Sequence, residues 1–90
     1  MTIEELLWDE KTLEKITQKH QLGRQEIEEV FENNYHVRRW EDLYYAYGQS
    51  VAGRYIFVVL LPLGQHRVHV VTARDMTLTE RRLYLRARKG

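Results

Sequence analysis

The chain of 90 residues contains no cysteine and only one proline, and both scarcities limit what it can be. Without cysteine there is no disulfide, no thiolate metal ligand and no cysteine nucleophile. Long hydrophobic runs are also missing. The longest, Tyr55 to Leu63, has nine residues and includes Pro62, whereas a membrane-spanning helix needs about 20 apolar residues. The opening residues do not resemble a secretory signal, so we expect a cytoplasmic protein with no membrane partner.

What is present indicates one small globular domain. The composition is 43% hydrophobic and 30% charged, which is typical of neither disordered nor fibrous chains. Because a chain this short builds one hydrophobic core, we expect residues 1–90 to form a single domain.

The charge is unevenly distributed, although the net charge is only +1. Residues 1–50 carry six basic and eleven acidic side chains, whereas residues 51–90 carry eight basic and two acidic ones. Such polarisation favours a surface that meets a polyanion. A solvated basic helix face would give the same counts, so the charge suggests nucleic acid without establishing it.

Helical and strand periodicity divide the chain. Asp9 can cap a helix whose apolar residues recur at three- and four-residue steps as far as His20, and a second helix is expected from Gln25 to Glu32. Beyond residue 35 the period changes to two. The candidate strands are Tyr35–Trp40, Leu43–Gly48, Arg54–Leu61 and His66–Ala73, the third of them central because it is apolar on both faces.

The connections complete the expected fold. Leu61 to Gly64 fits a type I turn, and in the following strand Val68 and Val70 are expected on one face, opposite Arg67, His69 and Val71. Thr77 and Glu80 form a capping box that opens a last helix ending near Lys89. We therefore predict an α+β domain with two N-terminal helices, an antiparallel four-stranded meander and a C-terminal helix.

Several stretches, taken in order, resemble the BrnT-type toxins. They are Trp8-Asp9-Glu10-Lys11, Lys19-His20, Glu26 with Glu29-Val30-Phe31, Tyr47-Gly48, Gly53-Arg54-Tyr55 with Phe57-Val58-Val59, and Arg67-Val68 with Val70 to Thr77, Glu80-Arg81 and Tyr84. The run from Thr72 to Thr77 followed by Glu80-Arg81 is the most distinctive. The resemblance covers roughly residues 8–88.

This resemblance implies a RelE-like fold and a ribonuclease toxin of a type II toxin–antitoxin pair. Such a toxin cleaves RNA without a metal or other cofactor and thereby inhibits translation. The implied partners are an RNA substrate and a BrnA-type antitoxin with a ribbon-helix-helix domain, through which alone DNA is contacted. Either a homo-oligomer or a heterotetramer with the antitoxin is compatible with this reading.

The residues themselves suit metal-free RNA cleavage, which needs a base, cations around the phosphate and an acid. Arg54 and Arg74 are candidates to hold the phosphate, and with Arg67 they are expected to meet at one sheet edge. His20 is the candidate acid–base group, because histidine changes protonation near neutral pH. Alternatively, His20 only favours the negative end of its helix.

Glu80 and Tyr84 share one helix face, where they act in catalysis or serve as a cap and a core aromatic. The further candidates for RNA contacts are Lys11, Lys19, Arg67, His69 and Arg81. His66 and His69 lie three apart on a strand and so point to opposite faces, and a zinc site is not expected.

A second function stays open: a catalytically inactive RNA- or antitoxin-binding module of the same fold. Gln21 and Gln49 stand where the family often has a glycine and a basic residue, which favours this alternative. His20, Arg54 and Arg74 at the motif positions favour the enzyme. A further hypothesis is that the acidic half contacts a basic segment of the antitoxin while the basic half faces RNA.

Overall fold

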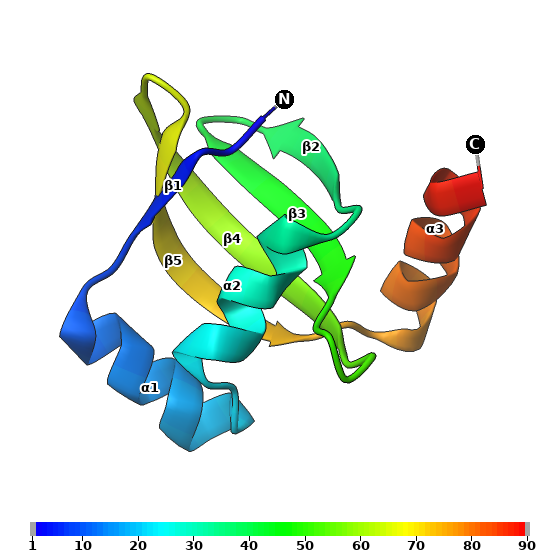
Figure 1. Cartoon of the computed structure of the whole chain (residues 1–90), viewed down its shortest axis with the longest axis horizontal. Coiled ribbons are helices and arrows are strands. Elements are labelled where there is room, and N and C mark those ends of the chain that lie inside the picture. The colour runs from blue at the N-terminus through cyan, green and yellow to red at the C-terminus, as the bar shows by residue number, and fades with distance from the viewer. Residues whose placement is uncertain (1, 90) are drawn as a thin grey trace.

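The computed structural model describes residues 2–89, which form three helices and one five-stranded mixed sheet (Figure 1). The elements are β1 (Glu5–Leu7), α1 (Glu10–His20), α2 (Arg24–Glu32), β2 (His36–Trp40), β3 (Leu43–Gln49), β4 (Tyr55–Gly64), β5 (Arg67–Asp75) and α3 (Leu78–Lys89). The strand order is β1-β5-β4-β3-β2, with β1 parallel to β5 and all other pairs antiparallel.

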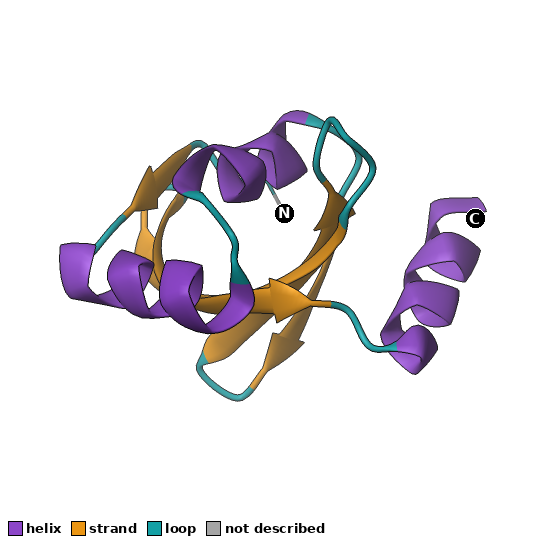
Figure 2. Cartoon of the chain, turned by 90° about the horizontal axis from the view of Figure 1, so that it is seen from below, coloured by secondary structure: helices purple, strands orange, loops and turns teal. Residues whose placement is uncertain are grey.

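The sheet separates two hydrophobic clusters. It curves around α1 and α2, and α3 stands apart from them beyond the end of β5 (Figure 2). The larger cluster lies between the sheet and α1 and α2 and includes Ile16, Leu22, Ile27, Val30, Ile56, Val58, Val68, Val70 and Ala73. The smaller cluster lies on the other face and consists of Tyr47, Phe57, Val59, Met76 and Tyr84. Within residues 2–89, no helix is long and apolar enough to span a membrane.

The helices α1 and α3 begin at the predicted capping residues. Asp9 Oδ1 accepts a hydrogen bond of 2.8 Å from the Lys11 amide at the start of α1. At the start of α3, Thr77 Oγ1 accepts from the Glu80 amide at 3.1 Å, and Glu80 Oε1 accepts from the Thr77 amide at 2.9 Å. Each cap satisfies backbone donors that the first helical turn leaves without partners, and the capping predictions are therefore confirmed.

The prediction of a four-stranded antiparallel sheet is wrong, because β1 adds a fifth, parallel strand at the edge. Glu5, Leu6 and Leu7 align with Arg67, Val68 and His69. A segment of three residues is too short to display a period of two, and its partner lies about 60 residues away along the chain. Only the assembled sheet defines it as a strand.

The predicted turn at Leu61 to Gly64 is also wrong, because β4 continues through Gly64. The turn instead occupies Gln65 and His66, whose φ angles of 56° and 63° are those of a type I′ hairpin. Pro62 is tolerated inside β4 because β3 pairs with β4 only as far as Leu60. Pro62 thus has a strand partner on one side only, where its missing amide need not break a ladder.

A bulge in β5 changes the predicted alternation and positions the functional residues. Leu60 pairs with Val70 and Val59 pairs with Thr72, so Val71 is the extra residue. Beyond it, Arg74 pairs with Phe57 on the α3 face of the sheet. Ala73 and Asp75 therefore lie on the α1 and α2 face. A strand without the bulge would place Arg74 on that face instead.

Candidate active site

The residues at the end of β5 bring Arg74 against the first turn of α3. Arg74 Nη1 and Nη2 donate to Glu80 Oε1 and Oε2 at 2.8 and 3.0 Å. Nη1 also donates to the Asp75 carbonyl at 3.0 Å, and the guanidinium carbon lies 4.4 Å from the centroid of the Phe57 ring. The capping box fixes Glu80, and Glu80 in turn fixes Arg74. Arg74 is therefore held on three sides.

One edge of the Arg74 guanidinium remains open. A guanidinium offers two forks of parallel N–H groups, one formed by the two Nη atoms and one formed by Nε with Nη2. Glu80 occupies the first fork. Within residues 2–89 the Nε–H and the second Nη2–H have no acceptor, and the side chain is 35% exposed. The open fork suits two oxygens of a phosphate group.

The Arg74–Glu80 pair shifts the pKa values of both partners. Hydrogen bonding from Arg74 lowers the pKa of the Glu80 carboxyl, and burial opposes this only in part. The same hydrogen bonding raises the pKa of Arg74. Glu80 is thus an ionised carboxylate with little tendency to take up a proton, which fits a residue that orients Arg74 better than it fits a base.

Arg54, in contrast, uses all of its N–H groups inside the protein. Its Nε and Nη2 donate to the two Asp75 carboxylate oxygens at 2.7 and 3.0 Å. Nη2 and Nη1 also donate to the carbonyls of His20 and Gln21, each at 2.8 Å, and Nη1 reaches Glu26 at 3.4 Å. Arg54 thereby joins the C-terminal end of α1 to the ends of β4 and β5, and no donor remains for a ligand.

His20 reaches the same end of β5 from the other side. Asp75 has a lowered pKa, chiefly because Arg54 bonds to it, and the charges of His20 and Arg81 contribute. His20 also lines a hollow of about 260 Å³ together with Lys19 and Thr72. Thr72 pairs with Val59 on the face that carries Arg74 and lies two residues before it, so the hollow adjoins β5 near its C-terminal end.

Tyr84 and Arg81 anchor α3 to the sheet. The Tyr84 side chain is buried, and its hydroxyl donates to the Asn34 carbonyl at 3.1 Å. Its ring meets the Tyr55 ring edge-on at 6.1 Å, and the Arg81 guanidinium carbon lies 4.3 Å from the Tyr55 centroid. These contacts hold the helix that carries Glu80.

The structure does not bring every predicted site residue to this place. Arg67 begins β5 and lies seven residue steps, roughly 20 Å, before Arg74. The expectation that Arg54, Arg67 and Arg74 meet at one edge is therefore wrong for Arg67. His69 also lies toward the far end of β5, and Lys11 lies in the first turn of α1, far from His20 at its end.

Sequence reasoning assigned no role to Asp75 or Phe57, which hold the two arginines in place. The signal for Asp75 was present, because Asp75 and Glu80 are the only carboxylates after residue 50. What was missing was the register that aligns Asp75 with Ile56, two residues from Arg54.

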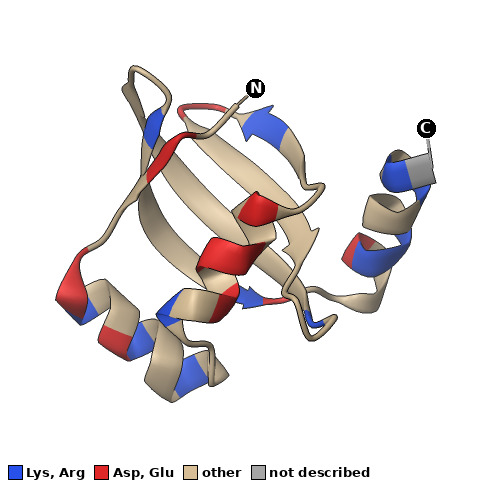
Figure 3. Cartoon of the chain, viewed as in Figure 1, with Lys and Arg blue, Asp and Glu red and all other residues tan. Residues whose placement is uncertain are grey.

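Charge is segregated around this site. Figure 3 shows acidic residues gathered on α2, while basic residues lie on α3 and at the end of β5. Next to Arg74 the α3 face carries aromatic rings, with Tyr45 and Tyr47 each about 5 Å from Phe57 between ring centroids. In the described part of the chain, no group of three or more His, Asp or Glu residues gathers as a potential metal site.

Comparisons with known proteins identify a family and a similar fold. The family model described as "Ribonuclease toxin, BrnT, of type II toxin-antitoxin system" matches residues 8–80. The crystal structure of the Brucella abortus ribonuclease toxin BrnT is similar with a TM-score of 0.67 and 23% sequence identity. The match covers 84% of this chain and 99% of that one, and it shows a shared fold. No curated protein sequence matches the chain.

Proposed function

Because the chain belongs to the BrnT family of ribonuclease toxins from type II toxin–antitoxin systems, we propose that it is an active, metal-independent endoribonuclease. Cleavage of cellular RNA would inhibit translation. The observation that carries the proposal is the open fork of Arg74, which lies on an aromatic, basic face at the end of β5. Family membership supplies RNA as the substrate class.

The reaction follows from what the site can stabilise. The 2′-oxygen of one nucleotide attacks the adjacent phosphorus, the 2′-hydroxyl proton passes to a base, and the 5′-oxygen leaves with a proton from an acid. The products are a 2′,3′-cyclic phosphate and a 5′-hydroxyl. Negative charge grows on the non-bridging oxygens, and the Nε–H and Nη2–H of Arg74 would donate to two of them.

His20 is the proposed acid–base group, because it approaches the β5 end from α1 and an imidazole can both accept and donate a proton. Arg54 would act as a positioning residue by binding the His20 carbonyl, and Glu80 would position Arg74. Tyr84 would hold α3 in place. Lys19 and Arg81 are the side chains proposed to contact RNA beside the site, and Lys11, Arg67 and His69, which lie away from it, would contact only a longer RNA.

The partner proposed for this chain is a BrnA-type antitoxin with a ribbon-helix-helix domain that contacts the operator DNA. The helix α2 packs on the face of the sheet opposite the one that carries Arg74. Its glutamates, exposed at Glu32 and half-buried at Glu26, Glu28 and Glu29, give this helix an acidic surface (Figure 3). Such a surface suits a basic segment of the antitoxin by charge complementarity. Two toxins bound to a dimeric antitoxin would give a heterotetramer.

The decisive experiment is cleavage of RNA by the purified protein in EDTA. We expect wild type and the control Arg82→Ala, an exposed residue of α3, to cleave alike. Arg74→Ala and His20→Ala should each lose about 10²- to 10³-fold in rate while remaining folded. Absence of cleavage by the folded wild type, on free RNA and on ribosomes, would contradict the proposal and favour a catalytically inactive binding module.

A further inference from the structure

A groove follows α3 along the β2 side of the sheet, beyond the Arg74–Glu80 pair. It consists of three adjoining hollows that share lining residues. The first hollow lies beside Arg38 and Tyr47, the third lies beside Gln49, and the second lies between them. The first and second share His36, Tyr84 and Ala87, and the second and third share Asn34 and Arg88. Because each hollow shares its wall with the next, they form one continuous surface, which we name the α3 groove.

The α3 groove is cationic along its length. Arg86 and Arg88 line it from α3, and His36 and Arg38 line it from β2. None of the residues that line the three hollows is an aspartate or glutamate. A depression bounded by cations and free of carboxylates attracts a polyanion that can follow its course.

The near end of the groove adjoins the proposed active site. Tyr84 lines this end and lies on the same face of α3 as Glu80, one helical turn away. Tyr47 lines it from β3, and the His36 ring lies 6.3 Å from the Tyr47 ring with 33° between their planes. Tyr84 and Tyr47 are themselves buried and form the floor of the groove, whereas His36 is exposed. A strand bound at the Arg74 fork can therefore continue into the groove past the His36 ring, on which an unpaired base can stack.

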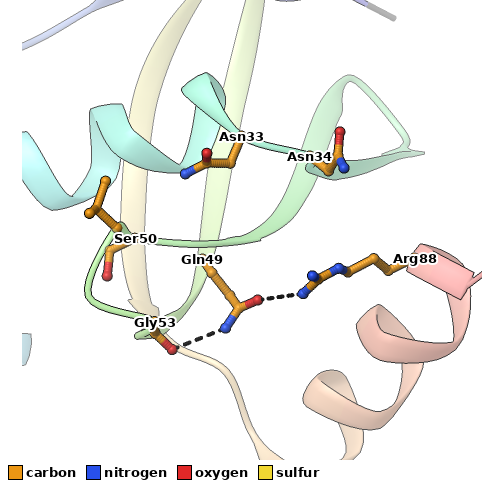
Figure 4. A pocket seen from close by; sticks show the side chains of 7 residues that line it. Asn33, Asn34, Gln49, Ser50, Gly53 and Arg88 are labelled. Carbon is orange, nitrogen blue, oxygen red and sulfur yellow. Dashed lines mark hydrogen bonds between the residues drawn. The ribbon is translucent and has the colours of Figure 1, made fainter.

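The far end of the groove is lined by side-chain amides (Figure 4). Asn33, Asn34 and Gln49 surround a hollow of about 400 Å³. Gln49 is held in place, since it donates to the Gly53 carbonyl at 3.1 Å and accepts from Arg88 at 2.8 Å (Figure 4). Within residues 2–89 the side-chain amide of Asn34 has no hydrogen-bond partner. Primary amides offer donors and acceptors together, as the edges of nucleobases do.

We propose that the α3 groove binds the single-stranded RNA that flanks the scissile phosphate. Its phosphates lie against Arg38, Arg86 and Arg88, and one unpaired base enters the amide-lined hollow at Asn34. This proposal rests on the proposed ribonuclease function and adds to it a site that selects substrate. An acidic peptide would need only the cations, whereas the exposed His36 ring and the side-chain amides match the chemistry of bases.

The test separates binding from cleavage by means of a 2′-O-methylated single-stranded RNA, which has no 2′-hydroxyl to attack. Its dissociation constant is measured by fluorescence anisotropy across a series of salt concentrations. The groove variant is Arg38→Gln with Arg86→Gln. The matched control is Arg39→Gln with Arg82→Gln, which removes the same two charges from the same β2 strand and α3 helix but outside the groove.

We expect the groove variant to weaken binding about ten-fold and to reduce the slope of log K against log salt by about 1.4, or about 0.7 for each lost phosphate contact. The control should change affinity by no more than about two-fold. If wild type cleaves RNA but the groove variant and the control lose the same affinity for RNA, the proposed groove site is wrong and the proposed ribonuclease function still stands. A wild type that neither binds nor cleaves RNA would overturn both.

Two further outcomes are decisive. If the groove variant binds RNA as tightly as wild type does but no longer binds its co-expressed antitoxin, the groove is a protein-docking surface and the proposal is wrong. For the amide-lined hollow, Asn34→Ala should narrow the differences in affinity among uncleavable oligomers of A, C, G and U. If this variant leaves the order and spread of affinities unchanged, no base is selected there.

Discussion

Arg74 and Glu80 meet through only one of the two forks of the guanidinium, with hydrogen bonds of 2.8 and 3.0 Å. Arg54 binds Asp75 through its other fork and spends every remaining N–H on α1 and Glu26. The sequence treats the two arginines alike, because both occupy motif positions. What distinguishes them is the number of donors left for a ligand: Arg74 keeps an open fork, and Arg54 keeps none among the described residues.

Arg74→Lys tests whether the open fork of Arg74 is needed for catalysis. Lysine keeps the positive charge but cannot donate in parallel to Glu80 and to two phosphate oxygens. We expect the single-turnover cleavage rate in EDTA to fall by about 100-fold, while the free energy of unfolding changes by about 1 kcal/mol or less, because the pair is partly exposed. Full activity of Arg74→Lys would mean that charge alone is sufficient.

Arg54→Lys tests whether the internal hydrogen bonds of Arg54 stabilise the fold. The substitution leaves the Asp75 carboxylate and the carbonyls of His20 and Gln21 short of donors, so we expect urea denaturation to show that the free energy of unfolding falls by about 2 kcal/mol. Arg24→Lys is the control, since Arg24 is exposed and its pair with Glu28 and its cation–π contact with Trp8 can both be made by lysine. A change below about 0.5 kcal/mol is expected there. Similar losses at both positions would contradict a structural role for Arg54.

The Glu80 carboxyl should give stability a defined pH dependence. Arg74 lowers its pKa from the ordinary value of 4.5, so the folded state holds the carboxylate more strongly than the unfolded state does. The resulting stability is fully present above the unfolded-state pKa and is lost as pH falls through the lower, folded-state value.

Glu80→Gln removes this contribution and leaves Asp75 unchanged. Urea midpoints of wild type and Glu80→Gln should therefore differ most above about pH 5 and converge as the pH falls below about 4. The wild-type protein should be the more stable at neutral pH. A difference in midpoint that stays constant from pH 3 to pH 7 would show that the stability contributed by Glu80 does not depend on its negative charge.

Local features of this fold could be predicted from sequence, and features that depend on register could not. The caps at Asp9 and Thr77 depend on neighbours within three residues, so they are visible in the sequence. The strand β1 and the bulge at Val71 exist only because distant segments pair. The same limit applies to the site, where the sequence predicts Glu80 as a capping residue but does not predict the Arg54–Asp75 pair.

Gly48 shows a further constraint that sequence alone does not reveal. A Cβ atom at this position would lie 2.7 Å from Val30 Cγ1, so glycine lets α2 approach β3. We expect Gly48→Ala to destabilise the fold by about 1–3 kcal/mol through overpacking. Gly23→Ala is the control, because its Cβ would meet nothing closer than 4.0 Å. If Gly48→Ala lowers the free energy of unfolding no more than Gly23→Ala does, α2 can move away from β3 without loss of stability.

The hairpin between β4 and β5 offers a stabilising substitution. Gln65 and His66 both have positive φ angles, of 56° and 63°, in a two-residue turn that favours Asn-Gly. Non-glycine residues in this region carry backbone strain, and Asn and Gly tolerate it better. The exchange also removes the contact of 3.0 Å between His66 Nδ1 and the Thr2 carbonyl, which is exposed and worth little.

We therefore expect Gln65→Asn with His66→Gly to raise the free energy of unfolding by about 1 kcal/mol, measured by urea denaturation. The single variant Gln65→Asn should give the smaller part of this gain and leaves the Thr2 contact in place. Since the turn lies at the opposite end of β5 from Arg74, RNA cleavage should not change. A double variant less stable than wild type would mean that the His66 contact outweighs the relief of backbone strain.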